Sequence, residues 1–261
     1  MHLDWSSMAA AMALMLVRLS TMIALAPFFS SRAIATRSKV VFCVVVAWLM
    51  IPAIAASAEQ SVHGIALSFS GLLGEVAVGA IYGLTLSLFG EMLLLAGQVV
   101  GLQFSFSLVN LLDPASEIQT PLMGDLFQLM GTLVLIAAGL DRILLASVIR
   151  SLRAVPPGSF SLDGVPATAK ALVPMLSGSF FAALELAAPV LAATVLVEVS
   201  VALLGKLSPQ LPVISLTVPL KTLTGFAILI GSLALWPRFI EARFSSLLDV
   251  AERLIAQGVK G

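Results

Sequence analysis

Six long apolar stretches separated by short polar segments dominate the hydropathy pattern of this chain. They cover residues 8–29, 40–56, 72–102, 122–140, 172–204 and 216–236. Most of them are close to, or longer than, the ~20 residues that a helix needs to cross a bilayer. The pattern therefore predicts an all-α polytopic membrane protein built of long helices, with about six hydrophobic elements.

Composition supports this class and excludes others. Hydrophobic residues make up 59% of the chain and charged residues only 11%, with a mean hydropathy of +1.08, whereas about a quarter of a soluble domain is charged. The net charge is zero and basic residues are scattered, so we expect no nucleic-acid binding. No Lys or Arg precedes the stretch 8–29, which we expect to be retained rather than cleaved as a leader.

The distribution of positive charge conflicts with a simple count of six spans. The segment 30–39 carries three basic residues and no acid, which places it in the cytoplasm by the positive-inside rule. Six successive spans would then put Arg142, Arg150, Arg153 and Lys170 outside. We therefore expect either that some stretches are re-entrant hairpins, or that the chain lies within a larger protein assembly.

One face of the third apolar stretch is lined with glycine. At about 100° per residue, five glycines project within roughly 40° of one another. Glycine costs about 1 kcal/mol relative to alanine inside a helix, so this stripe predicts close packing against another helix. The packing glycines are Gly79, Gly83, Gly90, Gly97 and Gly101.

Several ionisable residues lie within the apolar stretches: Arg18, Glu75, Glu91, Glu185 and Glu198. Such groups are expensive in hydrocarbon and mark a protein interior, a pathway or a partner contact. Arg18, Glu91 and Glu198 lie deep, where structural pairing or a partner contact is favoured over lining a conduit. Glu75 lies near the start of its helix, where snorkelling to the interface is an equal alternative.

The chain carries no recognisable catalytic or metal-binding motif. It lacks GxxxxGK[ST], HExxH and GxSxG sequences, and neither histidine has a carboxylate or cysteine at metal-ligand spacing. Asp113 and Asp141 have the surroundings of a turn and of a helix end near Gly139, not of a catalytic pair. Cys43, the only cysteine, is expected to be a small buried hydrophobe. We therefore expect neither an enzyme nor a cofactor.

Prolines and glycines predict where the helices stop. Pro189 should kink or break the stretch 172–204, and three prolines should prevent a regular helix across 207–221. The segment 154–168 has the composition of an exposed connection. After Pro237, apolar residues recur at helical spacing, which predicts a membrane domain over 1–237 and an amphipathic tail helix over 238–261, on a membrane or a partner.

The polar break between the third and fourth stretches reads GQVVGLQFSFSLVNLLDPASEIQTPLMG over residues 97–124. Together with APFFSSRAIATRSK (26–39) and LLGKLSPQLPVISLTVPLK (203–221), it resembles the FliR family of export-gate proteins of type III secretion systems, in the flagellar rather than the injectisome branch. The likeness covers nearly the whole chain in order and length.

This resemblance implies a non-enzymatic part of the flagellar export gate in the bacterial inner membrane, at the basal body. In that family the protein joins FliP-like and FliQ-like membrane subunits, with an FlhB-like switch protein nearby, in a helically wound all-α assembly. Unfolded flagellar proteins pass through its central conduit. Much of this assembly lies above the ordinary membrane plane, which would explain the conflicting charge count.

The resemblance also implies a hydrophobic plug over residues 104–112 that closes the conduit. Two positions that carry phenylalanine in the family fall on leucine here, and leucine can equally exclude water from a narrow pore. Lys206 stands where the family often has arginine, and counts with the buried or partner-facing charges. The plug residues expected from this comparison are Phe104, Phe106, Leu108 and Leu111.

Two other functions fit part of the same pattern. A stand-alone small-molecule transporter or channel would also use glycine packing and broken helices, although the chain lacks the paired interrupted segments that transporter repeats contain. A purely structural scaffold differs from a gate only in whether cargo crosses along the surface of this chain.

Overall fold

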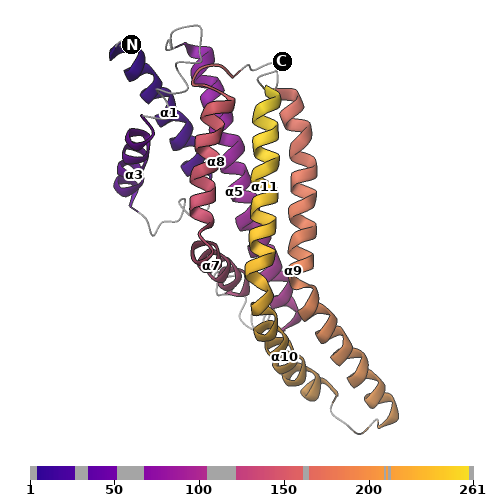
Figure 1. Ribbon diagram of the computed structural model, residues 1–261. Helices are drawn as coiled ribbons and strands as arrows, with labels where there is room; N and C mark the ends of the chain where they lie inside the picture. Colours follow the sequence, from indigo (N-terminus) through magenta and orange to yellow (C-terminus); the bar gives the residue numbers. More distant parts are fainter. Residues whose placement is uncertain are drawn as a thin grey trace, which may run out of the picture. The chain divides into compact units, whose positions relative to one another are not determined.

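The structure is a computed structural model that describes residues 5–26, 35–51, 68–104, 122–160, 165–208, 210 and 213–258. Every regular element among these residues is a helix (Figure 1). The helices are α1 (Trp5–Leu25), α3 (Thr36–Leu49), α5 (Phe69–Gln103), α7 (Leu122–Ala137), α8 (Leu140–Ala154), α9 (Val165–Leu207), α10 (Val213–Ser232) and α11 (Trp236–Gly258), with a short 3₁₀ turn at Leu233–Leu235. The predicted all-α class is confirmed.

Each predicted apolar stretch carries a helix, and local sequence explains several of the ends. The Ser68 hydroxyl accepts a hydrogen bond of 3.0 Å from the Gly71 N–H, an N-cap for α5. Gly139 lies between α7 and α8, at the helix end that the sequence predicted there. Its φ of 69° is one that glycine adopts readily. Hydropathy missed α8, because a helix that is charged on one side and apolar on the other has no continuous apolar run.

The predictions about proline hold in part. No helix of the described residues crosses 207–221, since α9 ends at Leu207 and α10 begins at Val213. However, α9 is not broken at Pro189 and runs for 43 residues, and α10 includes Pro219. Proline is tolerated inside apolar helices where neighbouring helices and Ser or Thr side chains compensate for the lost backbone hydrogen bond.

The described residues form two compact units. Unit 1 takes its residues from Met1–Gly90, Gly139–Leu176 and Phe244–Gly261, and unit 2 from Glu91–Ala138 and Ser177–Arg243. Helices α5, α9 and α11 contribute to both units. The division of the sequence into 1–237 and 238–261 stays a prediction.

The amphipathic helix predicted at the C-terminus is present as α11. In unit 1 its apolar face is buried within the chain itself, since Phe244 meets Phe89 of α5 edge to face with ring centroids 5.3 Å apart. In unit 2 the first residue of α11, Trp236, packs on Phe127 of α7 at 4.9 Å. Part of the face predicted to cover a membrane or a partner therefore belongs to the core.

Three helical segments of the described chain are long and apolar enough to cross a membrane: Phe69–Gln103, Leu172–Leu207 and Ser215–Ala256. A fourth candidate arises if α7 and α8 are counted together as one broken span. This number is below the six predicted elements, because the apolar part of α1, Ala9–Leu25, and the 14-residue α3 are too short, and α7 reaches the required length only together with α8. Length and composition therefore support a polytopic membrane protein.

Candidate functional site

In unit 1 the glycine stripe of α5 lies against α1. A Cβ atom at Gly79 would overlap the carbonyl oxygen of Arg18 and lie 2.9 Å from the Cβ of Thr21. A Cβ at Gly83 would lie 2.7 Å from the Cβ of Leu25. The missing side chains therefore let the two backbones approach closely, as small residues do between helices in lipid.

This close approach places a buried ion pair one turn before Gly79. The Arg18 Nε donates to Glu75 Oε2 at 2.5 Å and Nη2 donates to Oε1 at 3.1 Å, which is a bidentate pair. Arg18 and Glu75 are 1% and 0% exposed, so Glu75 does not snorkel to an interface. A pair removed from water to this degree is stable only if its remaining hydrogen-bonding groups also find partners.

The segment after α8 supplies those partners. The Val155 carbonyl accepts a hydrogen bond from Arg18 Nη2 at 3.2 Å, and the Gly158 N–H donates to Glu75 Oε1 at 2.9 Å. Ser151 of α8 accepts from Arg18 Nη1 at 3.1 Å. The guanidinium thus makes four hydrogen bonds, and both carboxylate oxygens are occupied.

The prediction that segment 154–168 is an exposed connection was therefore wrong. Val155 and Phe160 are buried, and α9 already begins at Val165. Pro157 and Gly158 occupy the centre of a turn closed by the Ser159 N–H on the Pro156 carbonyl at 3.1 Å. Gly158 has a φ of 83°, which a residue with a side chain rarely adopts. The composition of this segment indicated a connection, but not that its turn would bind a buried charge.

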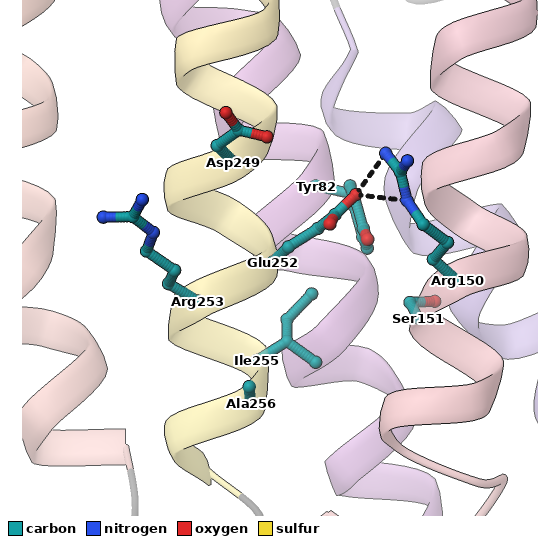
Figure 2. A pocket seen from close by; sticks show the side chains of 8 residues that line it. All are labelled: Tyr82, Arg150, Ser151, Asp249, Glu252, Arg253, Ile255 and Ala256. Carbon is teal, nitrogen blue, oxygen red and sulfur yellow. Dashed lines mark hydrogen bonds and ion pairs between the residues drawn. The ribbon is translucent and has the colours of Figure 1, made fainter.

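A second polar cluster of unit 1 joins α5, α8 and α11 (Figure 2). The Tyr82 hydroxyl donates to the Ser147 carbonyl at 3.1 Å, and the Ser147 hydroxyl donates to Glu252 Oε1 at 2.5 Å. Arg150 donates to the same oxygen from Nε at 3.1 Å and from Nη2 at 2.8 Å. Figure 2 shows Arg150 and Glu252 pointing toward one another from facing helices.

A cavity of about 450 Å³ lies beside this cluster. It is lined by Tyr82, Arg150, Ser151, Asp249, Glu252, Arg253, Ile255 and Ala256. Side chains of both charge signs line the cavity. The Arg150 side chain is 56% exposed and the Glu252 side chain 28%, so water screens this ion pair, and the pair contributes at most about 1 kcal/mol to stability. Among the described residues no cluster of histidine, cysteine and carboxylates could hold a metal ion.

In unit 2 the continuation of the same glycine stripe meets a different partner. A Cβ at Gly97 would overlap the Met123 carbonyl oxygen and lie 2.7 Å from the Gly124 Cα, and one at Gly101 would lie 3.2 Å from the Met123 side chain. These contacts are with the start of α7. Gly90, between the two halves of the stripe, is buried.

The C-terminal end of α5 lies beside α10 in unit 2. Phe104 follows the last residue of α5 and its N–H still bonds to the Val100 carbonyl at 3.2 Å. Its ring is 3% exposed and stacks on Phe226, with centroids 4.6 Å apart and 28° between the planes. The other expected plug residues, Phe106, Leu108 and Leu111, lie outside the described residues.

The remaining charges of the apolar helices have several environments. Glu198 of α9 is paired with Lys221 of α10, whose side chain is mostly buried, and Glu185 is paired with Arg243 of α11. Glu91 and Lys206 are exposed on this chain. The sequence pattern singled out Glu198 and Glu185, but not the cations that meet them.

The match to a family model and the likeness to individual proteins agree with one another. Residues 9–247 match the family model described as bacterial export proteins, family 1. The chain is 25% identical over 248 residues to the flagellar biosynthetic protein FliR of Caulobacter vibrioides, covering 91% of this chain and 94% of that protein. It is 25% identical to the FliR of Bacillus subtilis, with 93% of both chains covered, and 22% identical to that of Escherichia coli, with 93% and 91% covered.

Proposed function

Because this chain belongs to family 1 of the bacterial export proteins and its relatives are FliR proteins of flagellar biosynthesis, we propose that it forms part of the conduit of the flagellar export gate. In this proposal it assembles with FliP-like and FliQ-like subunits in the inner membrane, next to an FlhB-like switch protein. Unfolded flagellar proteins cross through the assembly, and the chain itself catalyses no reaction.

The observation that carries this proposal is the family match over nearly the whole chain. The exposed apolar surface supports it, since only 28% and 17% of the most apolar windows of Leu172–Leu207 and Ser215–Ala256 are buried within the chain. Such surfaces need lipid or other subunits to cover them. Glu91 supports it as well, because an exposed carboxylate on an apolar helix requires a polar partner or water.

Mass spectrometry of intact complexes tests the assembly. We expect a tag on this chain, after mild detergent extraction of its native membranes, to recover an assembly of fixed mass that contains two kinds of small hydrophobic subunit. A monomer or simple homodimer that persists across several mild detergents would contradict the proposal and would favour a stand-alone transporter.

Closure of the conduit is tested by removing the bulky side chains expected in the plug. In a variant with Phe106, Leu108 and Leu111 all changed to alanine, we expect assembled complexes that leak ions, because a narrow pore closed by apolar side chains opens to water when they are removed. The measurement is the decay of an imposed pH gradient in inside-out membrane vesicles. An assembled triple variant whose vesicles stay as tight as the parent would contradict the plug assignment.

A further inference from the structure

We propose that Phe104 is a positioning residue, held by Gly225 and Phe226, which fixes the end of α5 on α10 and does not itself close the conduit. This inference rests on the proposed conduit function. It separates Phe104 from the other three residues that the family likeness assigned to the plug. Phe104, Gly225 and Phe226 all belong to unit 2.

The first step is the position occupied by the Phe104 ring. The ring lies against Gly225 of α10, where a Cβ atom would overlap Cε1 of Phe104 and lie 3.0 Å from Cζ and 3.1 Å from Cδ1. Phe226 stacks on the ring from the next position along α10. The absence of a side chain at Gly225 thus creates the space for the ring, and Phe226 covers it.

The Phe104 side chain is buried within its own chain. Phe104 is 3% exposed, and Gly225 and Phe226 of α10 are among the residues that cover its ring. An aromatic ring in this environment contributes packing energy where it lies. Filling a water-accessible pore would require the ring to leave this site. The geometry therefore favours anchoring over plugging for this residue.

The last step is the support of α10 itself. One turn before Gly225, Lys221 pairs with Glu198 of α9, and Lys221 is only 8% exposed. The surface that receives Phe104 is thus tied to the long helix α9. An anchor is useful only on an element that is itself held in place, and α10 meets this condition.

The test compares two glycines of α10 in the complete gate complex. Gly225→Ala adds a methyl group that would overlap the Phe104 ring, whereas Gly231→Ala adds a methyl group where no atom beyond the adjoining stretch of helix lies within 4 Å. We expect Gly225→Ala vesicles to lose an imposed pH gradient faster than the parent, and Gly231→Ala vesicles to match the parent. Phe226→Ala should leak as well, and Phe226→Tyr, which keeps the ring, should restore tightness.

The triple alanine variant of Phe106, Leu108 and Leu111 separates failure of this inference from failure of the proposed function. If the triple variant leaks and Gly225→Ala stays tight, the anchor is wrong and the conduit stands. If assembled complexes of both variants stay tight, the conduit closure on which the anchor depends is wrong too.

A second measurement keeps the inference testable if Gly225→Ala fails to assemble. Changing Phe104 to alanine in that background removes the ring that the new methyl group overlaps. We expect the double variant to recover the assembled complex, seen as intact mass, and to leak. No recovery would show that the two positions do not meet, and would overturn the anchor.

Discussion

Changing Glu75 to alanine is expected to lower the stability of the folded chain by about 3–5 kcal/mol, since it leaves the Arg18 guanidinium charged, buried and without its carboxylate. Arg18 would lose two of its four hydrogen bonds, and the Gly158 N–H would lose its acceptor. We expect little full-length chain in the membrane and a lower temperature of dissociation for the purified complex.

Glu241→Ala is the control for this variant, because it removes an exposed carboxylate from a helix of the same chain. We expect it to accumulate like the parent. A double variant with Arg18→Met and Glu75→Leu should recover much of the loss, as replacing a whole buried ion pair by apolar residues is often neutral. Parental stability of Glu75→Ala would contradict the buried network.

Changing Gly97 to alanine is expected to cost about 3 kcal/mol, the upper end of the range for an overpacked core. The new methyl group would overlap the Met123 carbonyl oxygen and press on the Gly124 Cα. Backbone atoms cannot rotate out of the way as the end of a side chain can, so α5 and α7 must separate. The measurement is again the dissociation temperature and the yield of intact complex.

The control is Gly178→Ala in α9, where nothing lies within 4 Å of the added carbon. Because alanine favours a helix over glycine by about 1 kcal/mol, this variant should be as stable as the parent or slightly more stable. If Gly97→Ala and Gly178→Ala behave alike, the glycine stripe does not act through close packing with α7.

Most of the helices could be predicted from the sequence, because a continuous run of about 20 apolar residues is typical of a helix that lies in lipid. This measure failed for α8, whose charges interrupt the run. Neither Pro189 nor Pro219 ends its helix, because the rest of the helix gains more by continuing than the proline costs. Rules based on single residues give the free-energy cost of a proline or a charge in a helix, but not the packing energy that offsets this cost.

The sequence by itself determined the all-α membrane class, the glycine face of α5, the turn at Gly139 and the family. Only the tertiary structure decided which groups meet: that Gly79 faces α1 while Gly97 faces α7, and that Arg18 pairs with Glu75. Composition and periodicity are properties of one segment, whereas these contacts join residues 26 or more positions apart, from Gly97–Met123 upward, and exist only when separate helices pack.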